Sequence, residues 1–284
     1  MRVLRTPAEL SEWTEAARRE GRRVGLVPTM GFLHRGHLSL MEACRGRADL
    51  TAVSIFVNPT QFGPNEDLAR YPRDLEGDLK KCRETGVDVV FAPESGAMYP
   101  AGHRTFVEVA QLQDGLCGAR RPGHFRGVAT VVTQLFALAR PHLAVFGEKD
   151  WQQLQIIRRL AVDLHLGVEV VGMPIVREAD GLAMSSRNAY LEPADRERAT
   201  ALSRALAAAE RGARDGSLAD GLAAARAELA AAAIEPEYLE ARDAETLERV
   251  EGLTGRPILV AVAAHVGGAR LIDNVVIDPH MGIN

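Results

Sequence analysis

The stretch that decides the fold of this chain is Pro28-Thr29-Met30-Gly31-Phe32-Leu33-His34-Arg35-Gly36-His37. It follows an apolar run, Val24 to Val27, and precedes apolar residues with helical spacing, Leu38, Met41 and Cys44. This layout predicts a strand, a glycine-containing turn and a helix. The turn places backbone N–H groups and the positive end of a helix dipole beside two histidines one helical turn apart, so both rings can face one bound group. Such a site suits a polyphosphate.

Spacing alone leaves two other interpretations of His34 and His37 open. The pair also fits two solvated helix residues, or half of a metal site that lacks an obvious third ligand nearby. Gly31 and Gly36, with a strand before them and a helix after them, favour the phosphate turn.

A second apolar run, Leu50 to Val57, is typical of a central strand in a parallel sheet that helices cover on both faces. It ends at Asn58-Pro59-Thr60-Gln61. Ligands of such sheets bind beyond the carboxyl ends of the strands, so Asn58 and Gln61 are pocket candidates. The alternative is a turn amide that caps the backbone.

A second strand, turn and helix follow later in the chain. The expected strand His142 to Phe146 leads into Gly147-Glu148-Lys149-Asp150 and an expected helix from Trp151 to Leu164. A lysine at the carboxyl end of a strand can meet phosphate charge. The basic loop Arg120 to Gly127, before an apolar helix from Val128 to Ala139, is ambiguous, because a solvated basic turn has the same composition.

The remaining pattern alternates helix with strand up to residue 172 and predicts an α/β fold with a Rossmann-like, doubly wound parallel sheet. Its other expected elements are helices at 7–20 and 73–84 and strands at 87–91, 105–109 and 168–172. The loop from Phe62 to Pro72 is a candidate for a movable cover over the pocket.

We place a domain boundary near residue 175, which divides the chain into a nucleotide-binding domain at 1–175 and a smaller α+β domain at 176–284. The second domain should hold alanine-rich helices at 193–212 and 217–233 and strands at 236–242, 256–264 and 270–274. Residues 279–284 are expected to form a loose tail.

Composition favours small-molecule chemistry. The 284 residues are 46% hydrophobic and 25% charged. The net charge of −4 does not indicate a protein that binds nucleic acid, because such proteins usually carry a positive surface. The basic cluster Arg18, Arg19, Arg22 and Arg23 is interpreted as a solvated helix face. Three separated cysteines indicate neither a disulfide framework nor a zinc site, and we expect a cytoplasmic protein that is neither exported nor membrane-spanning.

Five segments in one frame carry a family resemblance: PTMGFLHRGH, NPTQF, RPGHFRGV, GEKDWQQL and MSSRN, between residues 28 and 188. Together they resemble the pantothenate synthetase (pantoate–β-alanine ligase) family. The His34-x-Gly36-His37 turn and Met184-Ser185-Ser186-Arg187 are also similar to the signatures of nucleotidyltransferases and class I aminoacyl-tRNA synthetases. The resemblance to this family implies that pantoate attacks the α-phosphorus of ATP and that β-alanine then displaces AMP from pantoyl adenylate.

The resemblance implies an ATP site made of four parts. They are Met30, Gly31, Phe32, Leu33, His34, Arg35, Gly36 and His37; Gly147, Glu148, Lys149 and Asp150; Val176; and Met184, Ser185, Ser186 and Arg187. Within this set His37 matches the family's proton donor, and we expect His34 and Lys149 to act with it in catalysis. Two positions where this chain departs from other members, Phe32 and Trp151, are expected to affect packing more than chemistry.

The resemblance also implies the sites of the other substrates. Gln61 and Gln153 match pantoate-binding positions, and Gln61 also matches a β-alanine contact; Asn58, Tyr71 and Arg121 fall on matching pocket positions. Taken alone, Gln153 fits an exposed helix residue, and Ser185 with Ser186 fits a helix cap.

Three further expectations come from the family. ATP is a substrate, Mg²⁺ is bound mainly through its phosphates with no dedicated protein metal site, and the chain forms a homodimer. The rival activities are a nucleotidyltransferase that leaves its product adenylylated and a nucleotide-sensing protein without turnover.

Overall fold

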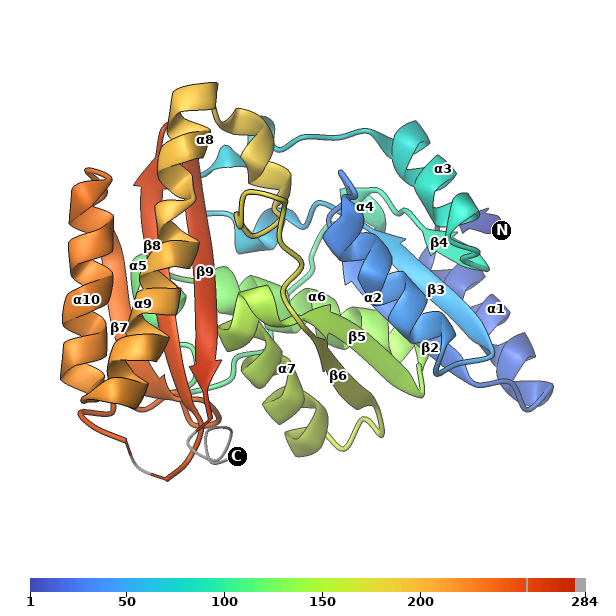
Figure 1. Ribbon diagram of the computed structural model, residues 1–284. Coiled ribbons are helices and arrows are strands. Elements are labelled where there is room, and N and C mark those ends of the chain that lie inside the picture. The colour runs from blue at the N-terminus through green and yellow to red at the C-terminus, as the bar shows by residue number, and fades with distance from the viewer. Residues whose placement is uncertain (254, 279–284) are drawn as a thin grey trace.

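The computed structural model describes residues 1–253 and 255–278, and it contains two sheets that lie side by side (Figure 1). The tail expected at residues 279–284 lies outside the described residues. No helix in the described part of the chain is both long and apolar enough to cross a membrane.

The first sheet has six parallel strands in the order β1-β4-β3-β2-β5-β6. Its strands are β1 (Arg2–Leu4), β2 (Val24–Thr29), β3 (Leu50–Ile55), β4 (Val89–Phe91), β5 (Leu143–Gly147) and β6 (Glu169–Met173). The helices and 3₁₀ turns that connect them are α1 (Pro7–Arg19), α2 (Arg35–Arg45), η1 (Pro59–Gln61), η2 (Asp67–Ala69), α3 (Leu75–Glu84), α4 (Ser95–Met98), α5 (Leu116–Arg120), α6 (His124–Ala139), η3 (Glu148–Asp150) and α7 (Trp151–Asp163). The expected doubly wound α/β architecture is confirmed.

Both faces of this sheet are covered, as the continuous apolar strands require. Leu26 of β2 packs into one core with α1, α6 and α7, whereas its neighbour Val27 packs into another with α2 and α3. Successive side chains of a strand point to opposite faces, so a strand buried on both sides must be apolar at every position.

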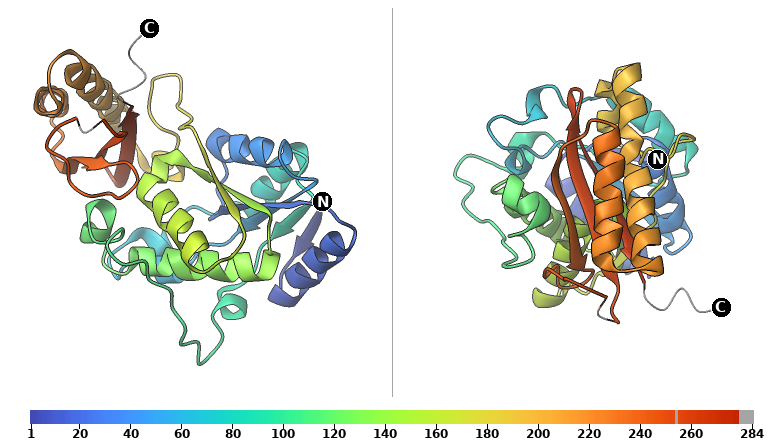
Figure 2. Two further views of the ribbon diagram at one scale, coloured as in Figure 1. Left: turned by 90° about the horizontal axis from the view of Figure 1, so that it is seen from below. Right: turned by 60° about the vertical axis from the view of Figure 1, so that its left-hand side comes forward.

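The second sheet is antiparallel, with β7 (Pro236–Asp243), β8 (Ile258–Val266) and β9 (Ala269–Ile277) in the order β7-β8-β9. Its outer face packs against the alanine-rich helices α9 (Ala201–Asp215) and α10 (Leu218–Ala231), which lie side by side in the right-hand view of Figure 2. The other elements of this region are η4 (Ser186–Tyr190) and α8 (Pro193–Ala199).

The inner face of the small sheet packs towards the large one. Tyr238 and Leu259 form a core with Leu116 of α5, and Trp151 packs against the same core. The Trp151 indole N–H donates to the carbonyl of Ala244 at 2.7 Å, which gives this departure from the family pattern a packing role. The division into two domains at residue 175 stays a prediction.

Two predictions of secondary structure are wrong. No strand forms at 105–109, because the N–H of Val107 donates to the Thr130 hydroxyl at 3.0 Å and the segment lies on α6 instead of joining a sheet. The single helix expected at 193–212 is two helices that meet at Thr200, whose hydroxyl donates to the carbonyl of Glu197 at 2.7 Å. The short edge strand β1 was not expected.

Candidate active site

A cavity of about 230 Å³ opens beyond the carboxyl ends of β2 and β5. These two strands are neighbours in the sheet, although the chain runs from β2 to β3 on the other side before it returns to β5. This is the topological switch point of the sheet, where doubly wound proteins bind ligands.

The histidine turn forms the first wall of the cavity. His34 is the N-cap residue of α2, and its ring centroid lies 4.0 Å from that of His37. Nδ1 of His34 is buried and makes no hydrogen bond to any described residue. Gly36 lies under the His34 ring, where a Cβ atom would approach Cε1 and Nδ1 to 3.0 Å.

The environment keeps both histidines neutral. Burial, followed by the nearby Lys149, lowers the pKa of His34 to about 4. Burial and then His34 and Lys149 lower the pKa of His37 well below its ordinary value. Nδ1 of His37 accepts a hydrogen bond from the His34 N–H at 3.3 Å, so the neutral ring carries its proton on Nε2. In this structure His37 is therefore a hydrogen-bond donor and not a cation.

Three backbone N–H groups of the turn are already bonded to other groups of the protein. The N–H of Gly31 donates to the Thr29 hydroxyl at 3.2 Å, and those of Phe32 and Leu33 donate to the carboxylate of Asp78 at 2.8 and 2.7 Å. Within the described chain, Gly31, Phe32, Leu33 and Arg35 do not line the cavity, whereas Met30, His34, Gly36 and His37 do. The turn thus meets a ligand mainly through side chains.

The lysine turn forms the opposite wall. Gly147, Lys149 and Asp150 line the cavity, and Glu148 is not among its described lining residues. Nζ of Lys149 lies 3.4 Å from the Asp150 carboxylate. Burial opposes ionisation of Asp150, but Lys149, His124 and Arg187 outweigh it and lower the pKa of this carboxyl group.

Asn274 of β9 holds the lysine turn in place. Its side-chain amide, almost fully buried, donates to the carbonyls of Glu148 and Lys149 at 2.9 and 2.8 Å. Sequence reasoning missed this residue. The signal is a polar pair, Asp273-Asn274, in the middle of a mostly apolar strand.

The segment from Met184 to Arg187 and the side chain of Val176 close the cavity from the side of the second sheet. The Ser186 hydroxyl donates to the carbonyl of Phe32 at 3.2 Å, so this segment is fixed to the histidine turn. The Ser185 hydroxyl accepts from the N–H of Arg187 at 3.2 Å, which caps η4 as the simpler interpretation expected.

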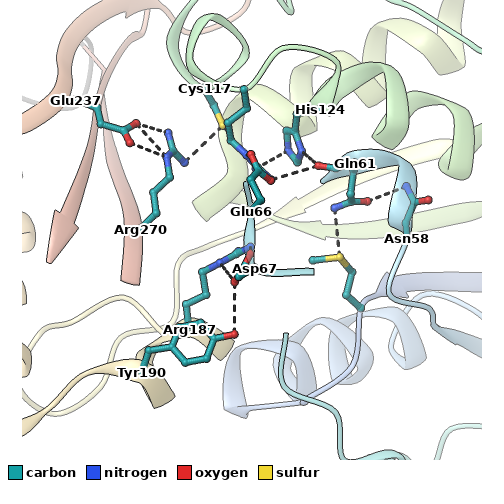
Figure 3. Close-up of polar contacts among 12 residues, drawn as sticks. Asn58, Gln61, Glu66, Asp67, Cys117, His124, Arg187, Tyr190, Glu237 and Arg270 are labelled. Carbon is teal, nitrogen blue, oxygen red and sulfur yellow. Dashed lines mark hydrogen bonds and ion pairs between the residues drawn. The ribbon is translucent and has the colours of Figure 1, made fainter. Parts of the chain in front are cut away.

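Two arginines at the cavity are each paired with an acid of the loop that was predicted to be a movable cover. Arg187 donates two hydrogen bonds to Asp67, at 2.9 and 2.8 Å, and Arg121 donates two to Glu66, at 2.7 and 2.6 Å. Figure 3 shows Arg187 and Tyr190 converging on Asp67. Burial alone would raise the pKa of each acid, but the guanidinium groups reverse the effect and lower it.

Gln61 and Asn58 lie together at the cavity, but their side chains have different partners (Figure 3). The Asn58 amide donates to Oε1 of Gln61 at 3.0 Å and to the carbonyl of Gly127 at 3.1 Å, and its oxygen accepts from the Tyr99 hydroxyl at 2.8 Å. Asn58 is thus occupied in holding Gln61, whose Nε2 contacts the Met30 sulfur at 3.3 Å.

Two adjacent glutamines of α7 face different surroundings. Gln152 is buried and bonded to the backbone of the 112–117 segment, including an N–H of Cys117 at 3.0 Å. Gln153 lines the cavity, and its side-chain amide makes no hydrogen bond to another described residue. The interpretation of Gln153 as a simple exposed helix residue does not fit this position.

Two further residues, Tyr71 and His124, also line the cavity. Tyr71 is buried and stacks edge-on against Phe62, with its ring 5.4 Å from the Arg187 guanidinium carbon. His124, to which sequence reasoning assigned no role, lies between Arg121 at 3.0 Å and the carbonyl of Gln61 at 2.8 Å. Burial, and then Arg121, lowers the pKa of His124 to about 4.

The three cysteines, Cys44, Cys82 and Cys117, are free and buried. Among the described residues, no group of three or more His, Cys, Asp or Glu side chains is arranged to hold a metal ion.

Comparison with known proteins agrees with this geometry. A family model described as pantoate-beta-alanine ligase matches residues 2–276. A pantothenate synthetase of Myxococcus xanthus is 59% identical over 277 residues, which are 96% of this chain and 95% of the relative. A second one, of Geobacter sulfurreducens, is 52% identical over 98% of this chain and 99% of its own length.

Solved structures give the same result. The crystal structure of a Thermus thermophilus pantothenate synthetase superposes with a TM-score of 0.92 at 49% identity, over 98% of this chain and all of the other. A Francisella tularensis pantoate-beta-alanine ligase, complexed with beta-gamma ATP and beta-alanine, has a TM-score of 0.81 at 31% identity and 97% coverage of both chains. With its sequence and its fold both matched over nearly their full length, the chain belongs to the pantoate-beta-alanine ligase family.

Proposed function

We propose that this enzyme condenses pantoate with β-alanine to form pantothenate through a pantoyl-adenylate intermediate, with release of pyrophosphate and AMP. The observation that carries the proposal is a single cavity lined by His34, His37, Lys149, Gln61 and Gln153. Groups suited to phosphate and neutral amides suited to a hydroxy acid thus face one space. A cavity with both kinds of group can hold a nucleotide and a small acid at bonding distance.

In the first half-reaction a pantoate carboxylate oxygen bonds to the α-phosphorus of ATP as the bond from that phosphorus to pyrophosphate breaks. We assign the triphosphate to His34, His37, Lys149 and the serines of the 184–187 segment. The Nε2–H of His37 donates to charge that grows on the departing pyrophosphate. Bound triphosphate would raise the pKa of this ring, because a nearby anion favours the cationic form.

We assign pantoate to Gln61 and Gln153, with Arg121 beside them, and β-alanine to Gln61. Neutral amides bind hydroxyl and carboxylate oxygens without placing a cation against AMP as it leaves. We give Asn58 the task of orienting Gln61, since its own amide is occupied. Substrate anions that reach Arg121 or Arg187 have to compete with Glu66 and Asp67.

In the second half-reaction the neutral amine of β-alanine attacks the acyl carbon, the bond between that carbon and the AMP oxygen breaks, and the nitrogen releases one proton to water. Pantoate needs this activation because a free carboxylate is a poor acyl donor, whereas AMP is a good leaving group. Catalysis then consists mainly of positioning and charge stabilisation.

We further propose that Mg²⁺ enters with ATP and is bound mainly through phosphate oxygens and water. The ionised Asp150 carboxylate, beside Lys149 in the cavity, fits a contact to that water shell. A homodimer remains a prediction from the family, and a cytoplasmic location remains a prediction from the cysteine usage and the N-terminal sequence.

The test is pantoate-dependent exchange of labelled pyrophosphate into ATP, with Mg²⁺ present and β-alanine absent, followed by addition of β-alanine. We expect exchange that requires pantoate, and then AMP and pantothenate in equal amounts. Exchange without release of free AMP on addition of the amine would indicate a nucleotidyltransferase. No exchange in folded protein that binds ATP would refute the proposal.

A further inference from the structure

The histidine turn is held by an acid that does not line the cavity and that sequence reasoning did not select. Asp78, on α3, is 1% exposed, and its carboxylate accepts the consecutive backbone N–H groups of Phe32 and Leu33 at 2.8 and 2.7 Å. A carboxylate that accepts two adjacent N–H groups fixes the orientation of the peptide plane between them.

The carbonyl groups of the same two residues are also bonded. Nζ of Lys81, one helical turn beyond Asp78, donates to the carbonyl of Leu33 at 2.8 Å and lies 4.0 Å from the Asp78 carboxylate. From the opposite side the Ser186 hydroxyl donates to the carbonyl of Phe32 at 3.2 Å. The turn is thus fixed between α3 and the 184–187 segment.

The turn needs such support because its backbone is unusual. Gly31 has φ of 83°, and Phe32, a residue with a large side chain, has φ of 50°. A left-handed conformation is unfavourable for a non-glycine residue and persists only where the surroundings enforce it. In this turn the enforcing groups are the Asp78 carboxylate and its partner Lys81.

The conformation of residues 31–33 sets where the histidines point. His34 follows directly as the N-cap residue of α2, and its own N–H fixes Nδ1 of His37. A rotation of the Phe32–Leu33 peptide therefore moves His34 and releases the ring orientation of His37. The side chains that we assign to the triphosphate depend on a carboxylate behind them.

We propose that Asp78, assisted by Lys81, is a positioning residue for adenylate formation: it holds the 31–33 turn so that His34 and His37 face the triphosphate. This inference rests on the proposed function. It also changes the expected mode of recognition, because the N–H groups of Phe32 and Leu33, which a phosphate loop would offer to its ligand, are used here to fix the loop.

The test compares Asp78→Asn with Asp74→Ala. An asparagine keeps the shape but has only one oxygen, so its NH₂ group would face one of the two N–H donors. Asp74 lies on the same helix and caps it by accepting from the N–H of Gly77 at 3.0 Å, without contact to the turn. Loss of this cap lowers stability only, which makes Asp74→Ala a matched control for damage to α3.

We expect Asp78→Asn to slow pantoate-dependent pyrophosphate exchange by about 100-fold, the scale for misplacing catalytic groups by about 1 Å, and to weaken ATP binding by about 10-fold. Reaction of β-alanine with supplied pantoyl adenylate should change less than about threefold, since the triphosphate contacts are no longer needed. A general structural defect would instead slow both half-reactions equally.

Lys81→Met provides a second variant if Asp78→Asn folds poorly. It keeps both backbone N–H bonds to Asp78, and it removes the contact to the Leu33 carbonyl together with the ion pair to Asp78. We expect a smaller loss of exchange, about 10-fold, with the same sparing of the second half-reaction. Exchange and ATP affinity like those of the wild type in the folded variants, or equal losses in both half-reactions, would overturn the inference. Wild-type protein that binds ATP but shows no exchange would refute the proposed function, and the ATP affinities would still test the turn.

Discussion

Replacement of Gly36 by alanine should separate activity from stability. The added Cβ would lie 3.0 Å from two atoms of the His34 ring, whereas ordinary contact begins at 3.4 Å, and 3.7 Å from Cβ of Met184. The ring must therefore move by about 0.4 Å, since Met184 is already at ordinary contact distance. If about 1 Å of misplacement costs about 100-fold in rate, this shift costs about sixfold.

Stability should change little. Gly36 lies in the first turn of α2 and does not have a positive φ angle, so alanine is compatible with its backbone. Alanine in a helix is favoured over glycine by about 0.5–1 kcal/mol, which offsets the strain at His34. We expect a free energy of unfolding within about 1 kcal/mol of the wild type, measured by urea denaturation.

Gly46→Ala is the matched control at the other end of the same helix. Its Cβ would have ordinary contacts of 3.7 Å to the carbonyls of Glu42 and Ala43, and the residue is exposed and far from the cavity. Pyrophosphate exchange by this variant should equal that of the wild type. If Gly36→Ala also exchanges at the wild-type rate, or loses activity only because it unfolds, then close packing of the His34 ring does not matter to catalysis.

Three further predictions concern charge and recognition. Lys149→Ala should slow adenylate formation by about 100- to 1000-fold in single-turnover assays. Replacement of the exposed Lys80 by alanine is the control and should leave this rate unchanged. An unchanged rate in Lys149→Ala would exclude the proposed role of Lys149. Gln153→Ala should raise the Kd for pantoate more than the Kd for ATP, measured by calorimetry, and equal losses would count against its role. The pKa of His124 is about 4 in the folded protein and 6.5 unperturbed, and that of His34 is similar. Because the unfolded chain binds more protons, the free energy of unfolding should fall as the pH drops from 6.5 to 4. The expected loss is about 3 kcal/mol for His124 alone. A free energy of unfolding in urea that stays constant between pH 7.5 and pH 5 would contradict this.

Much of the fold was predictable because the main strands are apolar on both faces. The runs that became β2, β3 and β5 could be placed from composition alone, and the ligand-binding end followed from their parallel order. The segment 105–109 is rich in residues that favour strands but lies on α6, because a local pattern does not specify which surface buries it. Helix propensity likewise predicted one continuous helix across Thr200. In the structure a hydrogen bond from the Thr200 hydroxyl to the carbonyl of Glu197 interrupts the helix there.

The cavity was predictable where its residues lie next to strand ends in the sequence. His34, His37 and Lys149 follow β2 and β5 directly, so the topology alone brings them together. Asp78 and Asn274 could not be found in this way. Each acts on backbone groups 45 or more residues away, and such a contact leaves no periodic signal in the sequence.

The ion pairs of Arg121 and Arg187 with acidic residues of the 62–72 loop also could not be predicted from the sequence. A basic residue beside a predicted phosphate site suggests a free cation, but each guanidinium group has a carboxylate partner from residues 66–67. Only the folded structure shows that these cations already have partners of their own.

Transfer of oxygen from pantoate to AMP tests the adenylate route most directly. Pantoate labelled with ¹⁸O at both carboxyl oxygens is incubated with ATP, Mg²⁺ and β-alanine, and the AMP formed is analysed by mass spectrometry. If a carboxylate oxygen bonds to the α-phosphorus and the acyl carbon–oxygen bond then breaks, each AMP molecule carries one ¹⁸O atom. Unlabelled AMP, or label in inorganic phosphate released together with ADP, would contradict a pantoyl-adenylate intermediate.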